Sequence, residues 1–160
     1  MTKATAAAEP VLPAAPSSAR LPQPHARGRQ RVLVVDDNHD ARVVLSAIVE
    51  HAGHAVVVAR DGAEALAVVA GFHPSVAIID IGLPDMNGYE LATHIRAGHG
   101  DDTPYLVALS GYGQASDRDR SSAAGFDVHL VKPVDLDQFL RVIEEPRVSG
   151  EFRTDRRSVL

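Results

Sequence analysis

Apolar residues along this chain gather in five short runs without regular polar alternation. The runs cover residues 32–35, 54–59, 75–80, 104–109 and 128–131. A strand that is covered on one face alternates apolar and polar residues, whereas a continuous run such as Val32–Val35 is typical of a strand covered on both faces. The pattern therefore predicts five strands of a parallel sheet.

A segment with helical spacing follows each run. The expected helices cover residues 38–52, 61–71, 89–97, 114–124 and 135–145. Asn38, Asp61 and Asp135 are suited to cap the first, second and last of them, and Asp61 with the acidic residue three positions on resembles a capping box. Gly53 and Gly98 are expected to end the first and third helices. The fourth helix is polar and Ala-rich, so we expect it to be the least stable element.

Strand and helix thus alternate five times along the chain. Such units pack as a parallel sheet with helices on both faces, joined by right-handed crossovers. The predicted fold class is α/β, a doubly wound (βα)5 sheet. At 160 residues the chain has the length of one domain with tails, and we place that domain at residues 31–145.

The two ends of the chain have a different composition. Residues 1–30 are rich in Ala and Pro and show no helix or strand period, which predicts a disordered tail. Residues 146–160 form a polar tail of mixed charge. Because only about 15 residues follow the last helix, we expect a stand-alone domain without an attached effector.

Charge is divided between these parts. Residues 31–145 carry a formal charge of −10, and the two tails carry +3 and +2, within a total of −5. An acidic body argues against nucleic acid as a partner of the folded domain. The chain has no Cys, no apolar run near the ~20 residues of a membrane span and no signal-peptide pattern, so we expect a cytoplasmic protein without a membrane partner.

Residues with candidate chemical roles lie where four of the predicted strands end. Asp36 and Asp37, Asp80, Ser110 and Lys132 follow the apolar runs directly, and the carboxyl ends of parallel strands share one edge, where ligands bind. Three close carboxylates repel one another, and Mg²⁺, which prefers oxygen ligands, relieves that repulsion. One carboxylate then becomes a nucleophile toward a phosphoryl group, while an ammonium and a hydroxyl stabilise the phosphoryl oxygens.

Four motifs at these strand ends resemble those of a known family. They are Val-Val-Asp36-Asp37-Asn38, Ile-Ile-Asp80-Ile-Gly-Leu-Pro-Asp-Met-Asn87-Gly88, Ala-Leu-Ser110-Gly-Tyr-Gly and Leu-Val-Lys132-Pro133. The set resembles the receiver domain of two-component response regulators over about residues 31–145, and the last two motifs are similar to receivers linked to hybrid histidine kinases. The resemblance implies a flavodoxin-like fold with strand order 2-1-3-4-5.

The resemblance also implies a role for each site residue. Asp80 would accept a phosphoryl group from a sensor histidine kinase or a histidine phosphotransfer protein. Asp37 and Asp80 would bind Mg²⁺ directly, Asp36 through water, and the backbone carbonyl of Gly82 would complete the protein ligands. Ser110 would move toward the phosphate after modification and act as a switch. Lys132 would pair with a phosphate oxygen. The peptide bond between Lys132 and Pro133 would be cis.

His129 departs from the usual family pattern. Receivers commonly have Tyr or Phe three residues before the Lys, as a side chain that turns inward on activation, and this chain has His129 there. Two alternatives remain open: the imidazole acts as the switch, or His129 is a solvent-facing strand residue.

The leading hypothesis is a phosphorylation-dependent switch, not an enzyme, whose output is binding to a downstream protein, a relay step or a homodimer. Modification adds a charge of about −1.5 to −2. One alternative is a phosphatase with Asp80 as nucleophile, but Gly82 stands where such enzymes have a second carboxylate. Another is a degenerate receiver that binds without phosphate. The presence of all four residues of the site counts against it: Asp37, Asp80, Ser110 and Lys132.

Overall fold

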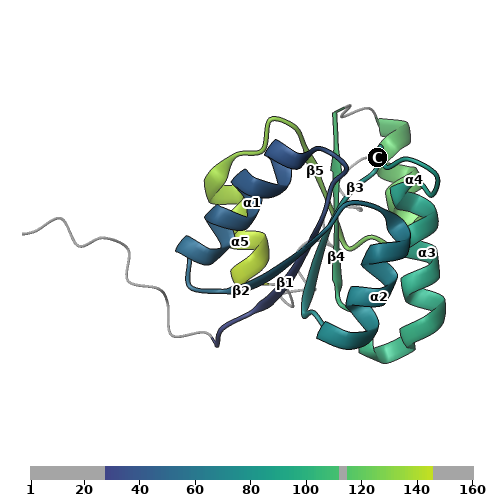
Figure 1. Ribbon diagram of the computed structural model, residues 1–160. Coiled ribbons are helices and arrows are strands. Elements are labelled where there is room, and N and C mark those ends of the chain that lie inside the picture. Colours follow the sequence, from purple (N-terminus) through teal and green to yellow (C-terminus); the bar gives the residue numbers. More distant parts are fainter. Residues whose placement is uncertain (1–27, 112–114, 146–160) are drawn as a thin grey trace, which may run out of the picture.

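The computed structural model describes residues 28–111 and 115–145. The two expected tails, 1–30 and 146–160, lie outside these residues except for positions 28–30. Five strands form one parallel sheet in the order β2-β1-β3-β4-β5 (Figure 1). The strands are β1 (Arg31–Val35), β2 (Ala55–Ala59), β3 (Val76–Asp80), β4 (Tyr105–Ser110) and β5 (Val128–Val131). The predicted doubly wound sheet and its strand order are confirmed.

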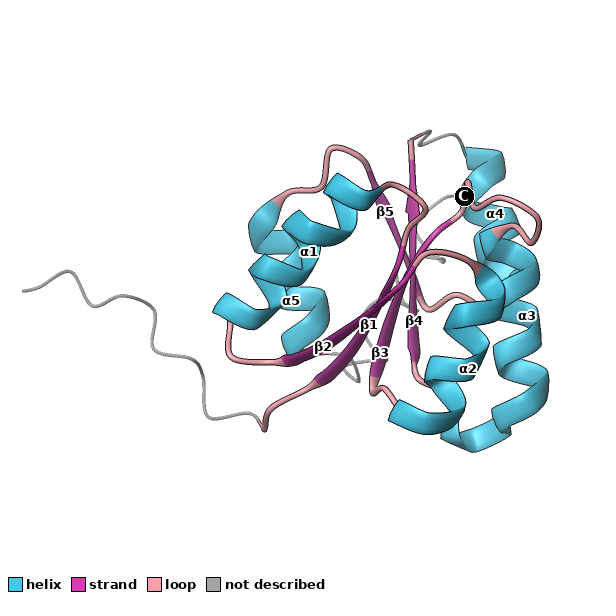
Figure 2. Ribbon diagram, in the orientation of Figure 1, coloured by secondary structure: helices cyan, strands magenta, loops and turns pink. Residues whose placement is uncertain are grey.

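Helices cover both faces of this sheet. They are α1 (His39–His51), α2 (Gly62–Phe72), α3 (Gly88–His99), α4 (Ala115–Ala124) and α5 (Leu136–Glu144), with a short 3-10 helix, η1 (Gly100–Asp102). Figure 2 shows α1 and α5 on one side of the sheet and α2, α3 and α4 on the other. None of the helices within the described ranges is long and apolar enough to cross a membrane.

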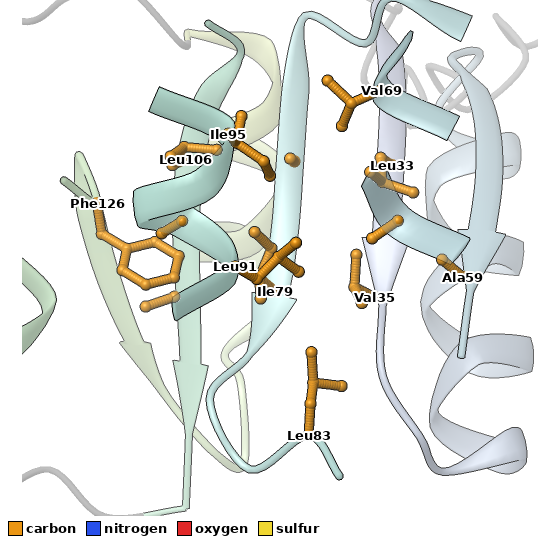
Figure 3. Packing of buried hydrophobic residues seen from close by; sticks show 14 residues of the cluster. Leu33, Val35, Ala59, Val69, Ile79, Leu83, Leu91, Ile95, Leu106 and Phe126 are labelled. Carbon is orange, nitrogen blue, oxygen red and sulfur yellow. The ribbon is translucent and has the colours of Figure 1, made fainter. Parts of the chain in front are cut away.

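The continuous apolar strands supply two cores, one on each face. In β1, Val32 and Val34 belong to the cluster that includes Phe139 of α5, whereas Leu33 belongs to the opposite cluster with Leu91 of α3. Figure 3 shows this second cluster between the sheet and the helices that cover it. All four residues from Val32 to Val35 are fully buried, which explains why the strand carries no polar alternation.

Two predictions about helix ends were wrong. Gly98 does not end α3, because the helix continues to His99 and passes into η1. The chain instead adopts positive φ at Gly100, where φ is 50°. The capping box is also not at Asp61: the Asp61 side chain accepts a hydrogen bond from the Glu64 backbone N–H, but the Glu64 carboxylate accepts from Arg60. Elsewhere, Gly53 follows α1 with φ of 89°, as expected.

The reciprocal capping box lies at the start of α3, beside the predicted site. The Asn87 side chain accepts from the Glu90 backbone N–H at 3.0 Å, and the Glu90 carboxylate accepts from the Asn87 backbone N–H at 3.2 Å. The next residue, Gly88, is buried, and a Cβ built on it would lie 2.7 Å from the backbone oxygen of Asp80 and from Cα of Ile81. Only glycine therefore lets α3 begin this close to the end of β3.

Gly88→Ala is expected to destabilise the fold by about 1–3 kcal/mol, since backbone atoms must shift to admit the methyl group. Gly98→Ala in the same helix is the matched control, because a Cβ there meets nothing within 4 Å. That substitution should be neutral or stabilise by up to about 1 kcal/mol through helix propensity. Urea unfolding of both variants measures the difference, and equal stabilities would contradict the close approach at Gly88.

A buried imidazole lies at the N-terminal edge of the sheet, where it links the residues before β1 and β2. His54 is 8% exposed, and its Nδ1 accepts a hydrogen bond from the Gln30 backbone N–H at 3.2 Å. Its Nε2 is buried, and no residue that the structure describes gives it a hydrogen-bond partner. Burial lowers the pKa of His54, a nearby Glu144 carboxylate opposes this shift, and Arg29 adds to it. The folded state therefore favours the neutral ring.

Stability is expected to fall as the pH decreases through the ordinary histidine pKa near 6.5, because the unfolded chain binds a proton there and the folded chain resists it. His54→Asn keeps an acceptor for Gln30 but does not titrate, so its free energy of unfolding should change less between about pH 7.5 and 5.5. His51→Asn, at an exposed position of α1, is the control and should behave as wild type. An identical pH dependence in His54→Asn and wild type would contradict this prediction.

Candidate functional site

The carboxyl ends of three strands hold the charged groups of the site. Asp36 follows β1, Asp80 is the last residue of β3 and Lys132 follows β5. Backbone hydrogen bonds extend the sheet past these ends, from Asp36 N to Ala59 O at 3.1 Å and from Lys132 N to Ser110 O at 2.8 Å. The side chains are therefore positioned by the sheet itself. The Lys132–Pro133 bond is cis, as the resemblance implied.

Three carboxylates meet at this edge. Oxygen atoms of Asp36, Asp37 and Asp80 all lie within 4.8 Å of one another. The side chain of Asp36 is 1% exposed and that of Asp80 is 13% exposed, whereas Asp37 is exposed to solvent. Local backbone donors orient the buried Asp36 and the partly buried Asp80, since Asp36 Oδ1 accepts from Asn38 N and Asp80 Oδ1 accepts from Gly82 N, each at 2.9 Å.

Lys132 is the cation of the cluster. Its Nζ lies 3.2 Å from Asp36 Oδ2 and 3.1 Å from Asp80 Oδ2, so one ammonium bridges both carboxylates. Burial lowers the pKa of Lys132, but the hydrogen bonds and charges of Asp80 and Asp36 outweigh burial and raise it above the usual 10.5. Lys132 therefore remains charged. Three carboxylates and one ammonium leave a formal charge of −2.

This donor set fits a magnesium ion. The ligating atoms are hard carboxylate oxygens, and the residual charge of −2 matches a divalent cation. The exposed Asp37 opens the cluster to water, which Mg²⁺ retains in its shell. Gly82 is exposed as well, and a Cβ there would lie 3.6 Å from Asp80 Oδ1, so its absence leaves the approach to Asp80 open.

Ser110 and His129 stand beside each other on neighbouring strands. Ser110 is buried at the end of β4, and its Oγ lies 2.6 Å from His129 Nε2. The other ring nitrogen, Nδ1, lies 2.8 Å from Oγ of Ser121 in α4. His129 is half-buried with both nitrogens bonded, so the structure does not have it as a solvent-facing strand residue.

The structure thus brings together all the charged residues predicted from the sequence, and it adds Ser121, which sequence reasoning missed. Ser121 is 2% exposed in the middle of a polar helix. The sequence of α4 is polar and carries almost no apolar pattern from which the packing of Ser121 against His129 could be predicted.

Comparisons with known proteins agree with this geometry. The family model of the response regulator receiver domain matches residues 32–144. An uncharacterized 14.6-kDa protein of Leptolyngbya boryana is 33% identical over 71% of this chain and 87% of its own length. Response regulator MprA of Mycobacterium tuberculosis is 37% identical over 69% of this chain, but the match covers only 47% of MprA. The chain therefore spans about half of the length of that relative.

Solved structures agree with the match to the receiver domain family. The chemotaxis protein CheY4 of Vibrio cholerae superposes with a TM-score of 0.69 at 28% identity, covering 74% of this chain and 98% of CheY4. The chain belongs to the response regulator receiver domain family. It is a receiver domain of the two-component signalling class, with a CheY-like fold.

Proposed function

We propose that this receiver accepts a phosphoryl group on Asp80 from a sensor histidine kinase or a histidine phosphotransfer protein, in a reaction that depends on Mg²⁺. The observation that carries the proposal is the position of Asp80. Its carboxylate is held by Gly82 N on one oxygen, contacts Lys132 on the other, and lies against two further acidic groups that fit a metal ion.

Each residue has a distinct chemical task in this proposal. An oxygen of Asp80 attacks phosphorus, the P–N bond to the donor imidazole breaks, and an acyl phosphate forms. Asp36, Asp37, Asp80 and the Gly82 carbonyl would hold Mg²⁺, which neutralises charge on the phosphoryl oxygens when it is bound. The Lys132 ammonium contributes a second positive charge, and the Ser110 hydroxyl supplies a hydrogen bond.

The alternatives to this function differ in chemistry. A phosphatase would need a second acid–base carboxylate two residues after the nucleophile, and Gly82 cannot supply it. We therefore propose a signalling domain that promotes only its own phosphorylation and dephosphorylation. A degenerate receiver would bind its partner without phosphate, which the experiment below separates from the main proposal.

We further propose that the receiver domain spans residues 31–145. The Leptolyngbya relative, matched over 87% of its length, supports this because it is itself little longer than a receiver. The output would be a contact with a downstream protein or a second copy, in the cytoplasm. The charge of −10 on residues 31–145 supports a folded domain that does not bind nucleic acid.

Intact mass measurement after incubation with acetyl phosphate tests the central proposal. We expect one phosphoryl group on the wild-type chain with Mg²⁺, and little or none when the metal is removed with a chelator. Circular dichroism must show the same folded signal in both samples. A folded chain that takes up no phosphoryl group with Mg²⁺ would overturn the proposal and favour the phosphate-independent receiver.

A further inference from the structure

A chain of hydrogen bonds runs from the end of β4 through His129 into α4. Ser110 Oγ lies 2.6 Å from His129 Nε2, His129 Nδ1 lies 2.8 Å from Ser121 Oγ, and Ser121 Oγ donates to the backbone oxygen of Asp117 at 2.8 Å. Both serines are buried, at 6% and 2% exposure. The predicted switch residue Ser110 is thus connected to a helix that contains no other fully buried side chain among residues 116–124.

The partners determine where the protons lie. The Asp117 carbonyl only accepts, so the single hydroxyl proton of Ser121 is used there and Ser121 Oγ is left to accept from the ring. Nδ1 therefore carries the proton of the neutral imidazole. Nε2 is then unprotonated, and the Ser110 hydroxyl donates to it.

We propose that His129 is a positioning residue that takes up a proton when Asp80 is phosphorylated, so that phosphorylation is coupled to pH. This inference rests on the function proposed above. In the resting state the Ser110 proton is directed to Nε2. When Ser110 donates to a phosphoryl oxygen instead, that proton leaves the ring, and a neutral Nε2 faces a serine oxygen without a hydrogen between them.

A proton taken up from solvent restores the hydrogen bond between His129 Nε2 and Ser110 Oγ. Once Nε2 is protonated, it donates to Ser110 Oγ, while the Ser110 hydroxyl donates to the phosphoryl oxygen and Nδ1 still donates to Ser121. Every group is then satisfied. The neutral Nδ1–H ring leaves Nε2 unpaired, and the neutral Nε2–H ring leaves Nδ1 facing a Ser121 hydroxyl whose proton is donated to the Asp117 backbone oxygen. Either unpaired, part-buried acceptor costs about 1–3 kcal/mol. The modified state therefore favours the charged imidazole.

The surroundings of the ring favour the neutral form at rest. Burial lowers the pKa of His129 and the Arg118 guanidinium lowers it further, while the Asp117 carboxylate and backbone oppose both. These two charged residues lie on α4, which packs against β5. On β4 the neighbouring group is the uncharged Ser110, and Lys132 directly follows β5. The resting ring is thus neutral at physiological pH, as the hydrogen-bond chain from Ser110 to Asp117 requires.

Histidine ring nitrogen NMR of the full chain tests the resting state and the coupling together. Without ligand, we expect His129 as the Nδ1–H tautomer, which is the less common form of free histidine, with a pKa below 6.5. With Mg²⁺ and beryllofluoride, a stable mimic of an acyl phosphate, the pKa of His129 should rise by about one unit or more. The ring nitrogen signals of His94, on an exposed face of α3, are the control and should be the same with and without beryllofluoride.

Beryllofluoride affinity across about pH 5.5–8 provides a second measurement with saturating Mg²⁺. Since the bound state takes up a proton, wild-type affinity should rise toward low pH by up to about tenfold relative to His129→Phe, which keeps a ring but does not titrate. Ser121→Ala removes the acceptor of Nδ1–H, so the tautomer preference should weaken and the pH dependence should shrink.

The possible outcomes separate the two proposals. If beryllofluoride binds but the pKa of His129 stays constant or falls, or the resting tautomer is Nε2–H, the proton coupling is overturned and Asp80 phosphorylation is unaffected. If the folded wild type binds no beryllofluoride and forms no phosphoryl adduct, the function proposed above fails, and the coupling fails with it.

Discussion

Asp80→Asn is expected to abolish phosphoryl uptake from acetyl phosphate while the protein remains folded. An amide has no anionic oxygen to attack phosphorus, so no adduct should be detected by intact mass at any Mg²⁺ concentration. The Asn side-chain oxygen still accepts the hydrogen bond that Gly82 N now gives to Asp80 Oδ1. Among the contacts that the described residues make with the Asp80 side chain, only the ion pair to Lys132 Nζ, 3.1 Å from Oδ2, is lost, and Lys132 keeps Asp36 as its partner.

Asp85→Asn is the matched control in the same loop. Asp85 is exposed and adopts φ of 64°, a conformation that Asn accepts as readily as Asp. This variant should take up phosphate at the wild-type level. An adduct that persists in Asp80→Asn would show that another group is the acceptor, and an equal loss in Asp85→Asn would show that the effect comes from charge and not from the nucleophile.

The positions of the central strands were predictable from the sequence because burial on both faces leaves a continuous apolar run, as in β1 and β3. The run from Val32 to Val35 is fully buried on both sides, and it ends where Asp36 begins. The order of the strands in the sheet is a different matter. No local pattern states which strands are neighbours, so the order 2-1-3-4-5 depended on the resemblance to a family and not on periodicity.

The ends of the helices were less predictable. A glycine ends a helix through its backbone conformation, and the sequence does not reveal which glycine adopts it. Gly98 is helical and in open space, while Gly100, two residues later, adopts positive φ. The Asp61 capping box failed for a similar reason. The Glu64 carboxylate accepts from the Arg60 backbone N–H, one residue before the cap, and sequence spacing alone does not reveal that choice.

The charged part of the site followed from the rule that parallel strands end on one edge. That rule brings Asp80 and Lys132 together, 52 positions apart in the chain, without knowledge of any side-chain conformation. The contact of His129 with Ser121 did not follow. It depends on how α4 packs against β5, and that helix has almost no apolar pattern from which its orientation could be deduced.

Lys132→Met is expected to change two properties of the site in opposite directions. Removing the ammonium leaves three carboxylates with a formal charge of −3, so Mg²⁺ should bind more tightly, by about tenfold. The rate of phosphoryl uptake at saturating Mg²⁺ should nevertheless fall by about a hundredfold, because one positive charge no longer stabilises the transferring group. Metal titration followed by fluorescence or calorimetry gives the first quantity, and the time course of intact mass gives the second.

Misfolding of the variant would not give this result, because the affinity for Mg²⁺ and the rate of phosphoryl uptake are expected to change in opposite directions. A variant that had lost the geometry of Asp36, Asp37 and Asp80 would bind Mg²⁺ more weakly and would also be phosphorylated more slowly. Arg141→Met, which removes an exposed cation from α5, controls for net charge and should leave both quantities within about twofold of wild type. Weaker metal binding in a folded Lys132→Met would mean that Lys132 does not compete with the metal for these carboxylates, although its Nζ lies within 3.2 Å of two of them.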